Sequence, residues 1–247
     1  MTIKEIDEAQ MNESFSKWLI NYEISAFTDL GKLVEFELST FDTWRKDFLS
    51  KEKELLKAQE ELKNKTNLTF DEQVILQMDS SDLISSDDED YISFEEEVLQ
   101  MLLIKIYSKF EIAIKNMYRQ KTCRSLPEKF AEWKEKYRND LSIDFEAIPG
   151  YLEVQTLHIY NNNFKHSGSI LNDKTAGEIF DKHLIDTIKD CISGTLYTNL
   201  LGVTSKNDFI EKLTLNTIKL NLSKDKIINL HTQAKIFLKK IYEEMYN

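Results

Sequence analysis

Residues 20–62 read INYEISAFTDLGKLVEFELSTFDTWRKDFLSKEKELLKAQEEL, and an apolar residue recurs at every seventh position of this stretch. The recurring residues are Ile20, Phe27, Val34, Phe41, Phe48, Leu55 and Leu62, and the stripe is widened by Leu30, Leu38 and Trp44. This spacing predicts one buried face of a long α-helix. The second position of a coiled-coil repeat is charged at Arg45 and Glu52, so we expect the face to pack on helices of the same chain instead of forming a free-standing coiled coil.

The composition favours helices along the whole chain. Only 6 Gly and 2 Pro occur in 247 residues, which is too few turn-forming residues for a β-sandwich or barrel. We therefore predict an all-α fold, with a long N-terminal helix or helical hairpin followed by a helical bundle.

The sequence lacks the marks of a membrane or secreted protein. No run of about 18 apolar residues is present, and the N-terminus, MTIKEIDEAQMNES, is polar and acidic. Cys123 and Cys191 lie far apart, with no second Cys or His at ligand spacing beside either. We expect a cytoplasmic protein without membrane contact, disulfide framework, metal site or cofactor.

The chain divides into three predicted segments: an N-terminal long-helix unit (1–78), an acidic linker (79–92) and a bundle (93–247). The end of the first helix, KEKELLKAQEELKNK, is expected to be solvated. A short helix follows from Thr69 to Met78, with Thr69 and Glu72 as a capping box. The next stretch, DSSDLISSDDEDY, is acidic and Ser-rich and is interpreted as a mobile linker. The alternative is a segment that mimics nucleic acid or covers basic residues of the same chain.

Five helices are predicted in the bundle. The first begins at the N-cap Ser93, and the second begins at Pro127. The third is YLEVQTLHIYNNNFKH, which follows a turn at residues 148–150 and stops at Ser167 and Gly168. The last two cover 175–201 and 223–246, and residues 204–223 between them form either a helix or a short strand pair.

The net charge of −11 is unevenly distributed. Nine acidic residues and no basic residue lie between Asp79 and Glu97, whereas residues 100–138 contain ten bases and four acids, a local balance of +6. Because phosphate binding depends on local Lys and Arg, the second stretch is where a polyanion would bind. The candidate RNA-binding residues are Lys115, Arg119, Lys121, Arg124 and Arg138.

The most specific chemical signal is the end of the third bundle helix. Asn161, Asn162, Lys165 and His166 gather there, where the helix dipole favours a protonated His. Asn162 and His166 are four residues apart and share a helix face. An alternative is that these side chains only cap the helix terminus. The remaining histidines, His158, His183 and His231, are interpreted as core or surface residues.

The stretch NNNFKHSG resembles the motif of the HEPN superfamily of helical domains, many of which are metal-independent endoribonucleases of bacterial toxin and anti-phage systems. In that motif an Arg and a polar residue precede a His near the end of the third helix. His166 matches the His, Asn162 matches the polar residue, and Asn161 stands at the place of the Arg. The resemblance covers about residues 93–201 and also includes the pattern LLIKIYSKFEIAIKNMYRQ of the opening helix.

The resemblance implies a first hypothesis, in which two copies form a homodimer that cleaves RNA. His166 would then transfer a proton while the RNA 2′-hydroxyl attacks the adjacent phosphate. The Arg of the motif would stabilise the negative charge that builds up on that phosphate, and this chain lacks it. Lys165 replaces the positive charge of that Arg only if it reaches the same face. The basic segment would hold the RNA backbone, while Tyr118, Trp133 and Tyr137 stack on bases.

The second hypothesis is a non-catalytic helical interaction protein that binds RNA, a nucleotide or a partner protein. Its N-terminal helices would form the assembly surface. The absence of the motif Arg favours this alternative.

Overall fold

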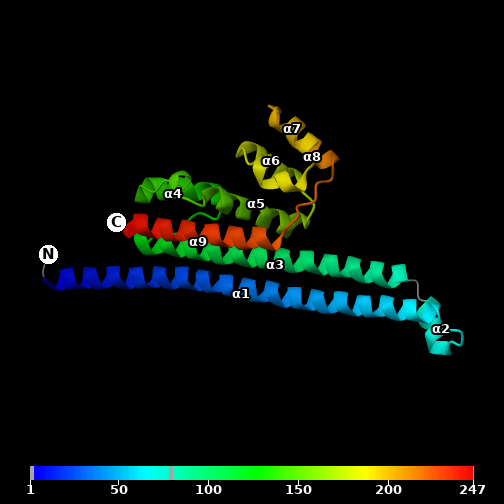
Figure 1. Cartoon of the computed structure of the whole chain (residues 1–247). Coiled ribbons are helices and arrows are strands. Elements are labelled where there is room, and N and C mark those ends of the chain that lie inside the picture. Colours follow the sequence, from blue (N-terminus) through cyan, green and yellow to red (C-terminus); the bar gives the residue numbers. More distant parts are fainter. Residues whose placement is uncertain (1–2, 78–79, 247) are drawn as a thin grey trace. The chain divides into compact units, whose positions relative to one another are not determined.

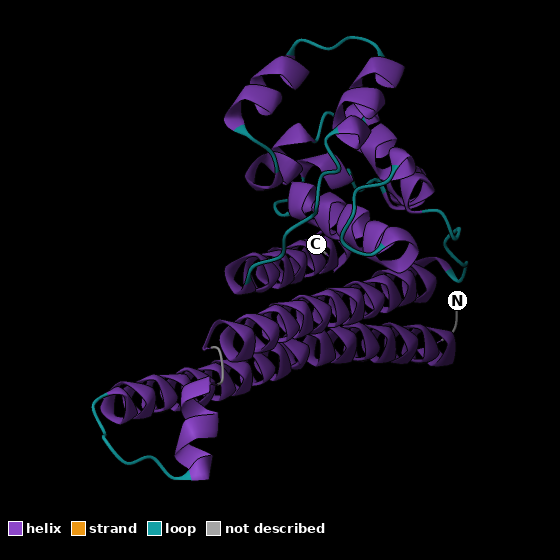
Figure 2. Ribbon diagram, turned by 90° about the vertical axis from the view of Figure 1, so that its right-hand side faces the viewer, coloured by secondary structure: helices purple, strands orange, loops and turns teal. Residues whose placement is uncertain are grey.

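A computed structural model describes the backbone of residues 3–77 and 80–246, and their side chains except those of 3–12, 48, 51–52, 55, 74–77 and 80–93. These residues form α-helices and two 3₁₀ helices, η1 and η2, and the single β-bridge among them joins Ile170 and Lys219 (Figures 1 and 2). The predicted all-α fold is therefore confirmed. None of the described helices is long and apolar enough to span a membrane.

The first helix, α1 (Ile3–Lys63), is one continuous element, in which the predicted apolar stripe is buried from Ile20 to Phe41. Phe27 packs on Phe110 of α3 (Ser80–Thr122) and on His231 of α9 (Lys224–Tyr246), with ring centroids 6.4 and 4.7 Å away. The stripe thus packs on helices of the same chain, as expected. Trp44 is instead half exposed, and the side chains of Phe48 and Leu55 lie outside the described residues.

The short helix α2 (Phe70–Gln77) begins with the predicted capping box. The Thr69 backbone N–H donates to Glu72 Oε2 at 2.9 Å, and the Glu72 N–H donates to Thr69 Oγ1 at 3.4 Å. Lys65 Nζ lies 2.6 Å from Glu72 Oε1 and lowers the pKa of that carboxyl through this hydrogen bond. The predicted last residue, Met78, lies outside the described residues.

The segment predicted as an acidic linker is helical. Helix α3 begins at Ser80, not at Ser93, so the backbone of residues 80–92 belongs to it. Two Ser residues and Asp82 open this helix, and such residues are favoured in the first turn, where they complement unpaired N–H groups and the dipole. The acidic composition of residues 80–92 predicts a linker, but these residues continue the helix. Asp79, where the linker was expected to begin, is not described.

The chain forms two compact units, and their boundaries differ from the predicted ones. The bundle unit comprises residues 1–33 and 99–247, and the hairpin unit comprises residues 34–98. The division falls inside α1 and α3, because each of these helices is long enough to contribute to both units. A boundary between units that falls inside a continuous helix is not marked by loop-forming residues in the sequence.

In the bundle unit, α5 (Tyr151–Ser167) packs against α9. Phe145 and Phe237 belong to the aromatic core, and their ring centroids are 5.1 Å apart. Helix α4 (Phe130–Leu141) begins three residues later than predicted, and the 3₁₀ helix η1 (Phe145–Ala147) leads into α5. Helix α9 lies alongside α3 in Figure 1.

The segment 175–201 is not the single helix that was predicted. It contains α6 (Asp173–Asp181), the 3₁₀ helix η2 (Ile185–Cys191) and α7 (Gly194–Leu201). The chain leaves α6 through His183 at φ 54°, and the Ser193 side chain caps α7, so local turn geometry interrupts an amphipathic pattern. Of the alternatives for 204–223, the structure has the helix α8 (Lys206–Leu215), which packs on α6.

Candidate functional site at the end of helix α5

The NNNFKHSG stretch occupies the last turns of α5, and its third Asn is structural. Asn163 is fully buried, and its Nδ2 donates to the carbonyls of Gly168 and Ile170 at 2.9 and 3.0 Å. Its Oδ1 accepts from the Asn172 backbone N–H at 3.2 Å. Asn172 in turn caps α6 by accepting from the Thr175 N–H at 2.8 Å. Asn163 therefore fixes the connection from α5 to α6.

His166 and Lys165 are exposed at the C-terminal end of α5. Within the described part of the chain, no hydrogen bond or ion pair involves either side chain. Their exposure leaves both groups accessible to a ligand, and no hydrogen bond from a described residue orients the imidazole. A general acid or base held by a second group would be better positioned.

Asn162 pairs with His158, one turn before it, and not with His166. With the ring proton on Nδ1, His158 donates to the Tyr107 hydroxyl at 2.7 Å and accepts from Asn162 Nδ2 at 3.0 Å. The ring also stacks on Phe130 at 4.4 Å. Sequence reasoning assigned His158 no partner, although an Asn four residues later was a usable signal.

The surroundings of His158 keep it neutral. Its pKa is lowered to about 3, mainly by burial and to a smaller extent by the nearby ammonium groups of Lys182, Lys174 and Lys165. Glu178 Oε2 lies 4.0 Å from His158 Nε2 but also 3.5 Å from Lys182 Nζ, which competes for its charge. A neutral imidazole with both nitrogens engaged is a structural hydrogen-bonding group.

Asn161, at the place of the motif Arg, is only 2% exposed. Its Nδ2 lies 3.5 Å from Asn162 Oδ1, and its own Oδ1 has no hydrogen-bond partner among the residues that the structure describes. The four residues predicted for catalysis thus fall into two groups: Asn161 is buried and the half-buried Asn162 is bonded to His158, while Lys165 and His166 are exposed. The structure does not bring Asn161 and His166 together on one accessible surface.

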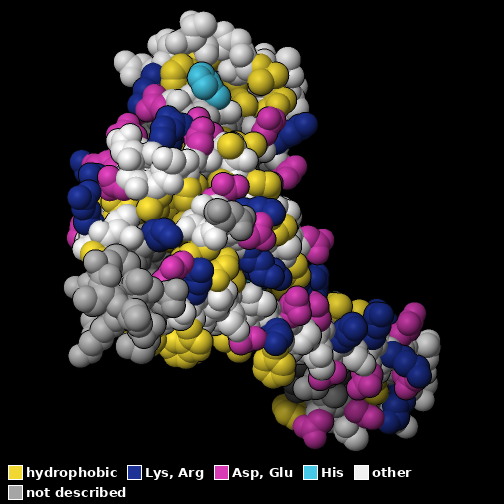
Figure 3. Space-filling view, turned by 90° about the vertical axis from the view of Figure 1, so that its left-hand side faces the viewer, with side chains coloured by type: hydrophobic (Ala, Val, Ile, Leu, Met, Phe, Trp, Pro, Cys, Tyr) yellow, Lys and Arg dark blue, Asp and Glu magenta, His cyan; other side chains and the backbone are white. Residues whose placement is uncertain are grey.

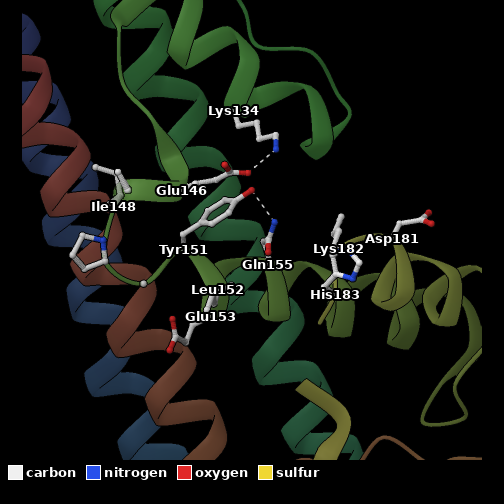
Figure 4. Close-up of a pocket in the computed structure, with 13 residues that line it drawn as sticks. Lys134, Glu146, Ile148, Tyr151, Leu152, Glu153, Gln155, Asp181, Lys182 and His183 are labelled. Atoms are coloured by element: carbon white, nitrogen blue, oxygen red, sulfur yellow. Dashed lines mark hydrogen bonds and ion pairs between the residues drawn. The ribbon is translucent and has the colours of Figure 1, made fainter. Parts of the chain in front are cut away.

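A groove lies toward the other end of α5, between α4, η1, the start of α5 and the end of α6 (Figure 4). Lys134 Nζ lies 2.8 Å from Glu146 Oε1 on one side, and the buried Gln155 donates to the Tyr151 hydroxyl at 2.7 Å. The Glu146 hydrogen bond raises the pKa of Lys134, and burial raises the pKa of Tyr151. These charges are paired within the groove, so it offers hydrogen bonds without an activated nucleophile.

Most of the predicted RNA-binding cations have partners within the chain. Lys115 lies 2.6 Å from Glu111. Arg124 lies 3.6 Å from Asp140, and Arg138 lies 2.7 Å from Asp144. Lys121 lies over the Tyr246 ring at 4.4 Å. Arg119 is exposed, and no hydrogen bond or ion pair with a described residue involves it.

Basic and acidic side chains are interspersed on the face shown in Figure 3. Arg124, Arg138 and Lys134 pair with Asp140, Asp144 and Glu146, which lie just beyond residues 100–138, so these acids offset part of the +6 balance. Such pairing reduces the number of cations that can release counterions on binding RNA.

The three aromatic residues predicted to stack on bases are core residues. Trp133 and Tyr137 are fully buried and donate to the carbonyls of Pro127 and Ile114 at 2.7 and 2.8 Å. Tyr118 is buried and donates to Asp140. None of them is available to a base without unfolding of the bundle.

No group of three or more metal-binding side chains occurs among the described residues. A scan against protein-family models finds no match to this chain, and searches of curated proteins and of solved structures find none.

Proposed function

We propose that this chain is a non-catalytic helical interaction protein that pairs with a second copy of itself through α1. The observation that carries the proposal is a ridge of three exposed aromatic residues, Phe15, Trp18 and Tyr22, which are 59, 59 and 61% exposed. Their rings stack in succession, with centroids 5.9 and 6.0 Å apart. We call these three residues the α1 ridge.

The α1 ridge is a contiguous apolar surface. An aromatic side chain covers about 150–250 Å² when buried, so three that are more than half exposed offer a few hundred Å². Patches of this size on soluble proteins mark interaction sites. Aromatic residues at the centre of an interface also contribute most of the binding energy.

The charge pattern favours a second copy of the same chain as the partner. From Phe15 to Ala26 the only charged residues are Lys17, whose Nζ lies over the Tyr246 ring of α9 at 5.0 Å, and Glu23, which contacts α3. Lys17 Nζ lies 2.9 Å from Glu13, and Glu23 accepts from Asn116 at 2.9 Å. A neutral apolar ridge can pack on its own copy without repulsion between like charges.

The first test is the solution mass of the full chain and of the variant Phe15→Ser/Trp18→Ser/Tyr22→Ser. We expect a dimer for the wild type and a monomer for the triple variant at the same micromolar concentration, because the substitutions remove the apolar surface without touching the core. Light scattering coupled to size exclusion measures both.

A matched control is Leu152→Ser/Leu215→Ser, which removes two other exposed apolar side chains of the bundle unit. This variant should keep the wild-type mass. A monomeric wild type, or a triple variant that stays dimeric, would contradict the proposal.

The second candidate function is metal-independent RNA cleavage, as the resemblance of NNNFKHSG to the HEPN motif implies, with a role in bacterial defence or a toxin–antitoxin pair. The observation that favours it is the exposure of His166 beside Lys165 at the end of a helix. A dimer would carry two such α5 ends, each with its own Lys165 and His166.

The test is incubation of single-stranded RNA with the protein in EDTA, with wild type compared with His166→Ala. If His166 moves the proton, cleavage should fall by roughly 100-fold or more in the variant. His183→Ala, which changes another exposed His, is the matched control. RNA that stays intact with the wild type would remove this candidate and leave the interaction role.

A further inference from the structure

The hairpin unit carries the negative charge of the chain. Residues 34–98 contain 19 acidic and 7 basic residues, a net charge of −12, whereas the rest of the chain has 24 acidic and 25 basic residues. A second copy of the hairpin unit, or a nucleic acid, would be repelled by such a surface. A partner of the hairpin unit should therefore be basic.

The hairpin unit also exposes an apolar surface. Phe41 and Trp44 of α1 meet Phe94 of α3, and all three pairs of ring centroids are 5.9 Å apart. Phe41 is buried beneath the other two, while Trp44 and Phe94 are each 49% exposed. We call these three residues the hairpin aromatic cluster. Half of the area of two large aromatic rings is thus open to a partner.

Carboxylates flank the hairpin aromatic cluster at helical spacing. Glu37 lies seven residues before Trp44 and Asp47 lies three residues after it, so both share the Trp44 side of α1. Glu97 lies three residues after Phe94 on α3. All three are exposed. Arg45 and Lys46 follow Trp44 directly, and successive helix positions diverge by about 100°.

We propose that the hairpin aromatic cluster is the docking site for a basic amphipathic helix of a partner protein. The apolar side of that helix packs on Trp44 and Phe94, and its Lys and Arg residues meet the flanking carboxylates. Aromatic faces also attract ammonium and guanidinium groups, which fits a cationic partner. The inference rests on the proposed role as an interaction protein, but it uses a surface separate from the α1 ridge.

The test uses the full chain and a fluorescently labelled Leu/Lys peptide of about 20 residues, designed as an amphipathic helix. Fluorescence anisotropy measures its dissociation constant. We expect saturable binding that weakens as salt rises from about 50 to 300 mM, because the carboxylates are exposed. Trp44→Ser/Phe94→Ser should weaken binding roughly tenfold or more.

Two further variants separate the contributions. Glu37→Lys/Asp47→Lys changes only exposed side chains and should also weaken binding roughly tenfold while reducing its salt dependence. Phe70→Ser removes an even more exposed aromatic residue at the start of α2 and should bind as the wild type does. Circular dichroism checks that each variant keeps its helix content.

The proposal is overturned if the Trp44/Phe94 variant binds the peptide as the wild type does, since the attraction would then be charge alone. It is also overturned if a scrambled Leu/Lys peptide without an apolar face binds equally well, or if single-stranded RNA binds the hairpin unit more tightly than the peptide. The α1 ridge variant should keep peptide binding, and the hairpin variants should keep the wild-type mass. Failure of one proposal is therefore distinguishable from failure of the other.

Discussion

Gly150→Ala is expected to lower the free energy of unfolding by about 2–5 kcal/mol. Gly150 precedes α5 with φ +88°, a left-handed conformation that costs a non-glycine residue about 1–2 kcal/mol. A Cβ at this position would also lie 2.5 Å from the Gln233 carbonyl oxygen of α9. That oxygen belongs to a helix backbone and cannot move aside cheaply, so overpacking adds about 1–3 kcal/mol.

Chemical denaturation of the purified protein measures this change. Gly194→Ala is the matched control, because its φ is not positive and no described atom outside its chain neighbours and its own helix backbone would lie within 4 Å of the added Cβ. We expect the control to stay within about 0.5 kcal/mol of the wild type. A Gly150→Ala protein as stable as the control would mean that α5 and α9 approach each other less closely than described here.

Acidification from pH 7 to pH 4.5 is expected to cost about 2–3 kcal/mol of stability through His158 alone. Its pKa is lowered from 6.5 to about 3 in the folded protein, so below pH 6.5 the unfolded chain binds a proton that the folded chain does not. The stability contributed by the neutral imidazole is therefore present above pH 6.5 and is lost as pH falls toward the folded pKa. Burial is the main cause, and the neighbouring ammonium groups act in the same direction.

Comparison of the wild type with His158→Gln isolates this contribution from that of the carboxylates. The variant is expected to be less stable at pH 7, since it loses the stacked ring on Phe130, and the gap should narrow as the pH falls. His183→Gln, which changes an exposed His, is the matched control for the substitution itself. Parallel profiles for the wild type and His158→Gln would indicate that Glu178 stabilises a protonated His158 after all.

The buried His158 network limits what the end of α5 can do. Asn162 is engaged by His158, and Asn163 holds the turn to α6, so only Lys165 and His166 remain accessible from the motif-like stretch. A short amide stands where the motif has an Arg, and its surroundings are closed to solvent. This arrangement is why we rank an interaction role above catalysis.

Periodicity predicted the long α1 helix and its buried stripe. An apolar residue at every second turn places the apolar side chains on one helix face, and that face must be buried against some other element, whichever element that is. The α2 capping box was predictable for a similar reason: both of its hydrogen bonds join residues three positions apart. The end of α5 at Ser167 and Gly168 also followed from local residues.

Other features of the fold could not be predicted from the sequence. The acidic stretch before Ser93 is helical because it forms the beginning of α3, although its composition suggested a linker. Tyr118, Trp133 and Tyr137 lie among basic residues in the sequence, yet tertiary packing buries all three.

The sequence by itself determined the helical class, the buried face of α1 and the uneven distribution of charge. These properties depend on residue type and spacing along one helix. Only the tertiary structure decided which side chains are accessible: it buried Asn161, joined His158 to Tyr107 across 51 positions, and left the α1 ridge, Trp44 and Phe94 exposed. Exposure depends on which helices pack together, and a helical period fixes the face of a helix but not its neighbour.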